Sequence, residues 1–329
     1  MAKVINGKSI PNMPWQDRPE GCDEVVWRYS ENPILSYKDI KKANTLFNSS
    51  VVEYKGEFRG VFRCDRTDMI PFLYKGKSKD GIHWEIEDEA FKFENEIEGV
   101  PYVYGYDPRV CEIDGRYYII WCTGMANWDP TIGMAYTDDF EKIYRMENAF
   151  LPYNRNGVLF PRKINDKYVM FSRPSDTGFG NPGDGSIYYS ESPDMIYWGK
   201  HRLVMSPAPG WQSFKIGGGP VPIETDEGWL LIYHGVKQTC NGVCYYAGAA
   251  LLDIDNPSKV LYRTKDYILS PRELYERVGD VDNVVFPVST LCDADTGRIT
   301  IYYGAADTVV GMAHTTVDEL IEFVKKNSF

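Results

Sequence analysis

The segment Tyr104-Gly-Tyr-Asp-Pro-Arg109 holds a carboxylate, Asp107, between aromatic rings and a proline. Because proline disfavours the helical region for the residue before it, Asp107 is expected in extended or turn geometry. The rings give the carboxylate a partly apolar surrounding, which raises the pKa of a carboxyl group and suits a sugar ring nearby. The alternative is a structural ion pair between Asp107 and Arg109, and the segment alone leaves both readings open.

Other ionisable residues follow strand-like runs of the chain, and they fall into two groups by charge. The carboxylates are Asp65, Asp107 and Asp307, and the cations are Arg63, Arg155, Arg173, Lys215 and His234. Clamps of Arg and Lys are a recurring way to bind phosphate, so the cations indicate an anion site. The triple glycine 217–219 would let backbone approach a ligand closely, although no Gly-Lys-Ser/Thr follows it. The alternative is that these charges form salt bridges between repeats of the fold.

The elements that carry these residues repeat along the chain. A strand, a tight turn and a second strand occur five times at a spacing of roughly 50–70 residues. The five runs are residues 51–63, 110–122, 161–173, 221–234 and 292–303. A further pair of strand-like segments follows each run, and the amphipathic helices that an α/β fold requires between strands are missing.

Five units of four short strands predict an all-β fold, a five-bladed β-propeller. We expect a single domain over residues 1–329, with an irregular N-terminal extension over 1–35 and a C-terminal helix over 316–326. The segment 27–35 is expected to lead into the first blade. A capping box formed by Thr316 and Glu319 indicates the start of the helix.

In a propeller the innermost strands line a central channel, and loops at its mouth build the site. From the repeats we place one group of polar residues just ahead of the blades: Asn48, Ser49, Asp107, Arg155 and Lys215. A second group is placed at or after the second strand of a blade: Arg63, Asp65, Arg173, His234 and Asp307. Equivalent positions in a propeller converge on the axis, so the two groups are expected to meet there.

The composition argues against several classes of protein. A net charge of −11 disfavours nucleic acid or an anionic membrane surface as a partner. No apolar segment approaches the roughly 20 residues that span a bilayer, and no signal peptide is visible. Seven scattered cysteines suit a reducing compartment, so a cytoplasmic location is expected. The closest pair, Cys240 and Cys244, lacks further ligands at metal spacing, and we expect neither a metal nor another cofactor.

Four segments carry a resemblance to a known family. They are Tyr-Asp-Pro-Arg at 106–109, Asn-Arg-Asn-Gly-Val-Leu-Phe-Pro at 154–161, Ser-Arg-Pro-Ser-Asp at 172–176 and Tyr-Trp-Gly at 197–199. In this order they resemble the β-mannoside phosphorylases of glycoside hydrolase family 130, whose fold is a five-bladed propeller. The resemblance runs from about residue 27 to the C-terminal helix. It implies inverting phosphorolysis, in which inorganic phosphate attacks the anomeric carbon of a β-mannoside and α-mannose 1-phosphate is released.

The resemblance also implies roles for single residues. Asp107 would be the single general acid, acting on the glycosidic oxygen through a hydroxyl group of the mannose. The phosphate-binding positions would be Arg155, Arg173, Lys215, His234 and Tyr245. The mannose would be held by Asn48, Ser49, Arg63 and Asp307, and the neighbouring Asp65 and Tyr106 complete the predicted substrate-binding set. The family further implies a homo-oligomer, with a hexamer among the forms considered.

Phosphate is already an anionic nucleophile, so a phosphorylase needs an acid but no protein base. An inverting hydrolase needs two carboxyl groups ~6.5–9.5 Å apart, with water between them. Two alternatives stay open: a β-mannoside hydrolase with Asp65 or Asp307 as base, and a sugar-binding propeller without catalysis. The leaving sugar is open between mannose, glucose and N-acetylglucosamine, with β-1,4-mannooligosaccharides or mannosyl-N-acetylglucosamine favoured as substrates. An ion pair from Arg109 to Asp107 would keep the carboxylate ionised and oppose an acid role.

Overall fold

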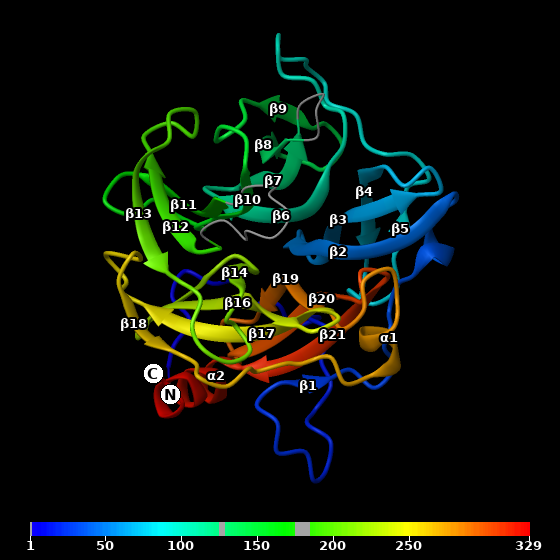
Figure 1. Ribbon diagram of the computed structural model, residues 1–329. Helices are drawn as coiled ribbons and strands as arrows, with labels where there is room; N and C mark the ends of the chain where they lie inside the picture. Colours follow the sequence, from blue (N-terminus) through cyan, green and yellow to red (C-terminus); the bar gives the residue numbers. More distant parts are fainter. Residues whose placement is uncertain (1, 125–128, 175–184) are drawn as a thin grey trace.

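The computed structural model of the chain describes residues 2–124, 129–174 and 185–329. Five antiparallel sheets surround a central axis (Figure 1), which confirms the predicted all-β, five-bladed propeller. Strands β2, β6, β10, β14 and β19 lie nearest the axis, one in each blade. These innermost strands carry half of the residues that the sequence predicts at the site, and most of the others lie on the next strand of a blade.

The first three blades are each built from four consecutive strands. Blade 1 holds β2 (Ala43–Tyr54), β3 (Glu57–Arg66), β4 (Pro71–Ser78) and β5 (Glu85–Ile86). Blade 2 holds β6 (Tyr106–Ile113), β7 (Arg116–Gly124), β8 (Pro130–Thr137) and β9 (Tyr144–Met146). Blade 3 holds β10 (Asn154–Leu159), β11 (Tyr168–Pro174), β12 (Ile187–Ser192) and β13 (Gly199–Met205).

The last two blades depart from this plan. Blade 4 holds β14 (Lys215–Gly218), β16 (Gly228–Thr239), β17 (Gly242–Leu252) and β18 (Val260–Arg263), and the short β15 (Ile223–Thr225) also pairs with β16. Blade 5 holds β19 (Val285–Cys292), β20 (Arg298–Ala305), β21 (Val309–Thr316) and β1 (Trp27–Arg28). The final blade therefore takes its outermost strand from the beginning of the chain.

The placement of β1 corrects one prediction. Trp27 and Arg28 do not lead into blade 1, because they pair with His314 and Ala313 of β21. Arg28 Nε donates to the buried Glu276 at 2.7 Å, in the short helix α1 (Leu274–Arg277). Trp27, which is 3% exposed, packs edge-on against Trp15. The pairing with β21 and the ion pair to Glu276 thus join the strand to the opposite end of the chain.

The core is divided among the interfaces between blades. Five large clusters of buried apolar side chains each join strands of two adjacent blades. Trp121 lies between blades 1 and 2, and Trp229 between blades 3 and 4. Because apolar burial holds blade against blade, the axis is left for polar side chains.

The tight turns explain why the repeats were visible in the sequence. The turns Lys55-Gly56 and Asp114-Gly115 have positive φ at both residues, at 52° and 81° in the first and 52° and 80° in the second. Two-residue hairpins require this geometry, and glycine adopts it without steric cost.

The helices are short. A 3₁₀ turn, η1 (Tyr37–Asp39), precedes blade 1, and helix α2 (Val317–Lys326) ends the chain. The Thr316 hydroxyl caps α2 by accepting from the Glu319 backbone amide at 3.3 Å. Of the helices in the described ranges, none has the length and apolar character needed to cross a membrane.

Candidate active site

Three consecutive blades carry the same irregularity on their innermost strand. The register shifts between Phe47 and Ser50 in β2, between Tyr106 and Arg109 in β6, and between Arg155 and Val158 in β10. Within these bulges Asn48, Asp107 and Asn156 are left-handed, with φ of 44°, 52° and 54°. Left-handed backbone at a non-glycine residue costs about 1–3 kcal/mol, and bulges re-aim side chains near functional sites.

The bulges also explain an error in the predicted boundaries. Asn48, Ser49, Asp107 and Arg155 were expected ahead of their blades, yet they lie inside β2, β6 and β10. Lys215 likewise is the first residue of β14. A bulge interrupts the alternation of apolar and polar residues, so the sequence pattern locates the strand only after it.

The Asp107 carboxylate, 7% exposed, is held by two donors from blade 1. Its Oδ1 accepts from Asn48 Nδ2 at 2.8 Å and from Arg63 Nη1 at 2.9 Å. Arg63 also makes two hydrogen bonds to Asp65, at 2.8 and 2.9 Å, through Nε and Nη2. The guanidinium carbon lies 4.1 Å from the Phe47 ring centroid and 5.2 Å from that of Tyr106. Arg63 thus positions both carboxylates from between two rings.

Asp307 brings a third carboxyl group to this side of the site. It follows β20 in a left-handed turn, with φ of 48°. Burial raises its pKa to about 7; the nearby Asp107 and Asp65 also raise it, whereas Arg63 lowers it. Residues from blades 1, 2 and 5 therefore form one acidic cluster around a single guanidinium.

The opposite side of the site is basic. Arg173 Nη1 lies 3.0 Å from His234 Nε2, and Arg155 Nε donates to the Tyr106 hydroxyl at 3.2 Å. With its amide oxygen turned to the guanidinium, Asn156 accepts from Arg173 Nη1 at 3.0 Å and from Nη2 at 3.3 Å. Arg173 is 6% exposed, and its buried Nε has no hydrogen-bond partner in the described part of the chain.

These cations raise one another's electrostatic energy. Burial, with the nearby Arg173 and Arg155, lowers the pKa of Lys215 to about 7. Burial, with Arg173, Arg109 and Lys215, also holds the pKa of His234 well below its usual value. A bound anion would relieve this repulsion, which is the physical signature expected of an anion-binding pocket.

The remaining members of the basic side come from blades 4 and 5. The Lys215 ammonium lies 5.4 Å from the Tyr245 ring centroid, and the His234 ring lies 6.1 Å from the same ring. The Phe286 ring, on β19, lies 4.4 Å from that of His234 and forms an apolar wall. Burial raises the pKa of Tyr245 to about 12, so its hydroxyl stays protonated and can donate to an anion.

Most of the predicted site residues therefore meet at the axis, but Ser49 behaves differently, as does Arg109, which was considered only as a partner of Asp107. Ser49 is buried, and its hydroxyl donates to the Phe47 carbonyl at 3.3 Å in its own strand. Arg109 forms no ion pair with Asp107, because its three donors all reach backbone carbonyls. The ion pair with the Asp107 carboxylate is formed by Arg63 and not by Arg109. Ser175 and Asp176 of the third family-like segment lie outside the described residues.

One residue of the site, Asn156, lies in the segment 154–161 that the sequence singled out but was given no role of its own. Asn156 occupies the position in β10 that Asn48 and Asp107 occupy in β2 and β6. Aligning the repeats on these polar residues would have identified Asn156. In all three strands the polar residue lies in the bulge, just before regular pairing with the next strand resumes.

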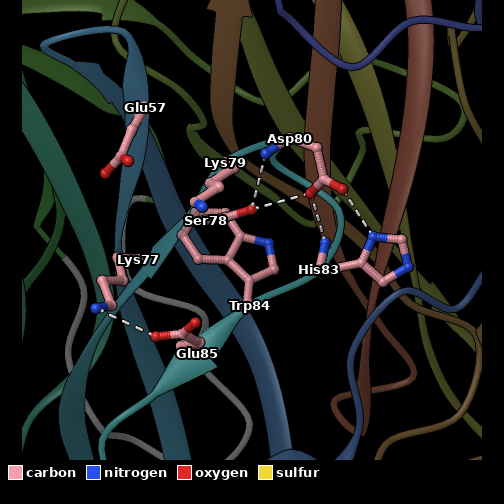
Figure 2. Close-up of a pocket in the computed structure, with 8 residues that line it drawn as sticks. All are labelled: Glu57, Lys77, Ser78, Lys79, Asp80, His83, Trp84 and Glu85. Atoms are coloured by element: carbon pink, nitrogen blue, oxygen red, sulfur yellow. Dashed lines mark hydrogen bonds and ion pairs between the residues drawn. The ribbon is translucent and has the colours of Figure 1, made fainter.

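A pocket on blade 1 lies away from this network (Figure 2). Its walls include Asp80, His83 and Trp84, at the turn between β4 and β5. Asp80 accepts from the Ile82 and His83 amides at 2.9 and 2.8 Å, and these bonds fold the turn. Asp139 and Asp194 make the same pair of backbone bonds in blades 2 and 3. The Asp80 carboxylate in this pocket therefore belongs to a structural turn that blades 2 and 3 repeat.

Comparison with known proteins places the chain among carbohydrate-active enzymes. Residues 6–326 match a glycoside hydrolase family 130 model described as β-1,4-mannooligosaccharide phosphorylase. A β-1,4-mannooligosaccharide phosphorylase of Ruminococcus albus is 56% identical, over 99% of this chain and 98% of the relative. A β-1,2-mannobiose phosphorylase of Listeria innocua is 30% identical, over 90% of this chain and 97% of the relative. The solved structure of a Listeria innocua β-1,2-mannobiose phosphorylase superposes with a TM-score of 0.80 at 28% identity, covering 92% of this chain and 99% of that one.

Proposed function

The chain belongs to glycoside hydrolase family 130, it performs phosphorolysis of β-mannosides, and we propose β-1,4-mannooligosaccharides as its substrates and Asp107 as its acid. The substrate proposal is supported by the 56% identity to the Ruminococcus albus β-1,4-mannooligosaccharide phosphorylase. The site proposal is supported by one observation above all: a carboxylate cluster on one side of the axis faces buried cations on the other.

In the proposed reaction an oxygen of inorganic phosphate attacks the anomeric carbon from the face opposite the leaving sugar. The bond from that carbon to the glycosidic oxygen breaks, and the oxygen receives a proton that originates on Asp107. The proton passes directly or through a hydroxyl group of the mannose. Attack from the opposite face inverts the anomeric centre, so a β-mannoside gives α-mannose 1-phosphate and a shortened oligosaccharide.

The phosphate is assigned to the basic side. Arg155, Arg173, Lys215, His234 and Tyr245 are the proposed ligands, with Asn156 fixing the Arg173 guanidinium. Oriented donors in a buried pocket stabilise the charge that phosphate redistributes during transfer. The buried Nε of Arg173, which has no hydrogen-bond partner in the described residues, is available to donate to phosphate.

The mannose ring is assigned to the acidic side. Asn48, Arg63, Asp65, Tyr106 and Asp307 are its proposed partners, and Ser49 contributes through the shape of the bulge. Carboxylates and amides bind sugar hydroxyls as acceptors and donors, and the Tyr106 ring supplies an apolar face.

A hydrolase on this fold is less well supported by the same geometry. Its base would have to be Asp65 or Asp307. Both Asp65 oxygens accept from Arg63, and the raised pKa of Asp307 leaves much of it protonated near neutral pH. Asp65 is therefore poorly placed to take a proton from water, and a hydrolase would have to use Asp307, whose pKa of about 7 suits a general base.

The decisive experiment is incubation of the protein with β-1,4-mannobiose and β-1,4-mannotriose, with and without phosphate. We expect mannose 1-phosphate, and turnover only when phosphate is present. Free mannose at an equal rate without phosphate would establish the hydrolase instead. Parallel reactions with mannosyl-N-acetylglucosamine and mannosylglucose identify the leaving sugar, and a preference for either would overturn the mannooligosaccharide assignment.

We further propose a cytoplasmic homo-oligomer, with a hexamer as one expected form. The proposal is supported by the cysteine usage of the chain and by the family. Its mass in solution, measured by light scattering, tests the assembly, and a monomeric mass would contradict it.

A further inference from the structure

Arg109 is a buried cation that the proposed reaction does not use. It lies in β6, two residues after Asp107, and is 1% exposed. Nε donates to the Gly219 carbonyl at 2.7 Å and Nη2 to the Gly218 carbonyl at 2.8 Å. Nη1 donates to the Asp107 carbonyl at 3.2 Å. One side chain thus joins blade 2 to blade 4, whose innermost strands belong to different sheets.

The two ends of this connection are the two halves of the site. The Asp107 carbonyl belongs to the bulge that directs the acid. Gly218 and Gly219 continue directly from Gly217, whose backbone pairs with His234 across β14 and β16. A Cβ placed on Gly217 would come within 2.5 Å of both the Asn156 side-chain amide and His234 Cε1. The segment held by Arg109 therefore forms the floor beneath the basic pocket.

Arg109 also carries charge into that pocket. Its hydrogen-bond acceptors are neutral carbonyls. Among the described residues it forms no ion pair with a carboxylate, and the nearby Asp107 carboxylate pairs with Arg63 instead. Burial lowers its own pKa, and its charge is one of those that lower the pKa of His234. A guanidinium without a counter-ion beside an anion pocket adds to the attraction for phosphate.

We propose that Arg109 is a positioning residue that sets the separation between the Asp107 acid and the phosphate pocket and adds its charge to phosphate binding. The proposal rests on the proposed function. Guanidinium geometry suits the task because its planar fork reaches two adjacent carbonyls and a third on the other side. An ammonium group keeps the charge but cannot reproduce this fork.

Two variants separate geometry from charge. Arg109→Lys keeps the charge and loses the fork, so kcat is expected to fall by about 10²-fold, as for a misplacement near 1 Å, with the KM for phosphate changing less. Arg109→Met loses both, so the KM for phosphate rises as well. The shift in melting temperature caused by added phosphate should persist in Arg109→Lys and shrink in Arg109→Met. Arg116→Met is the matched control, because Arg116 lies in the same blade, exposed and paired with Asp138.

The readouts distinguish positioning from support of the fold. A purely structural arginine would lower the melting temperature of both variants and leave kcat and the phosphate KM of the folded fraction at wild-type values, which would overturn the proposal. If Arg109→Met does not fold, the kcat of Arg109→Lys alone tests the positioning role. An unchanged kcat in the folded lysine variant would refute it. Wild-type protein that makes no mannose 1-phosphate would instead refute the proposed function.

Discussion

Arg63 of blade 1 binds the Asp107 carboxylate of blade 2 across 2.9 Å and holds Asp65 with its two other donors. The proposed acid is therefore oriented by a neighbouring blade and kept at a fixed place at the axis. Substrate that reaches the Asp107 carboxylate must share it with this guanidinium. This relationship makes the acid dependent on the integrity of the interface between the two blades.

Replacing the acid tests its role directly. Asp107→Asn keeps an acceptor oxygen for Asn48 and Arg63 but cannot donate a proton to the leaving sugar. We expect kcat on β-1,4-mannobiose to fall by about 10²–10⁴-fold, the usual contribution of general acid catalysis. A β-mannoside with a nitrophenolate leaving group needs no acid and should lose far less, as measured by mannose 1-phosphate formation.

Asp138→Asn is the control for this substitution, because Asp138 is an exposed carboxylate of the same blade. Equal losses on the natural and the activated substrate would contradict the acid assignment, since a general acid matters only where the leaving group is poor.

The titration of Lys215 in the basic pocket leads us to expect that anion binding takes up a proton. Lys215 has a pKa of about 7, below that of an exposed lysine, so the amine loses its charge as the pH rises through neutrality. An anion favours the charged form, so anion affinity should fall above pH 7 and binding there should take up a proton. Sulfate, which does not titrate in this range, isolates the effect in calorimetry with two buffers of different ionisation enthalpy.

In Lys215→Met the proton uptake should disappear, and sulfate affinity should fall by about 1.5–3 kcal/mol, the value of a charged hydrogen bond. Proton uptake that is unchanged in this variant would assign the titration to another group.

The fifth blade contributes a carboxyl group whose ionisation opposes folding. Asp307 has a folded-state pKa of about 7, above the value of about 3.9 in an unfolded chain. Between these values the folded state binds more protons, so the contribution of Asp307 to stability falls as the pH rises through this window. Asp307→Asn should therefore raise the melting temperature relative to wild type above pH 7, and the advantage should vanish towards pH 4.

The expected gain is only about 1 kcal/mol, because Asp307 remains partly exposed and solvent screens its charge. The same variant should bind the mannoside more weakly if Asp307 contacts the sugar. A stability difference that is constant with pH would contradict the raised pKa.

The floor of the pocket tolerates no added methyl group. Gly217→Ala would bring a Cβ within 2.5 Å of both His234 and Asn156, displacing side chains around the proposed phosphate site. We expect kcat/KM for phosphate to fall by about 10–100-fold, as for a small misplacement of binding groups. Gly199→Ala is the matched control, because open space surrounds that position in β13. Steady-state kinetics at varied phosphate concentration measure kcat/KM for both variants. Equal kcat/KM values in the two variants would show that Gly217 does not form part of the phosphate pocket.

The blades could be predicted because each hairpin is recognisable from local sequence, by turns such as Asp114-Gly115 and the strands on either side. The sequence also predicted which residues gather at the axis, since a repeat brings equivalent positions together. The resemblance supplied the reaction, and the chain's membership of the family supports it.

What the sequence could not predict depends on distant contacts. Two nitrogens of Arg109 donate to carbonyls about 110 positions away, and Trp27 pairs with His314 at the other end of the chain. The left-handed backbone of Asn48, Asp107 and Asn156 is imposed by the bulges, and asparagine and aspartate tolerate that conformation without requiring it. Local pattern therefore placed the start of each strand too late and offered Arg109 only the nearby Asp107 as a partner.

The last blade borrows β1 from the start of the chain, and Ala2 donates its amide to Asp318 of the final helix. Figure 1 shows the two ends of the chain side by side. The ring is consequently sealed only after the last blade has been synthesised, so an incomplete chain cannot possess the whole catalytic centre. The ring also has no obligatory starting point: with its ends joined by a short linker, it could be opened at the hairpin tip Lys55-Gly56 and keep every sheet partner. Circular permutation would then move the seam to blade 1 while leaving the chemistry at the axis unchanged.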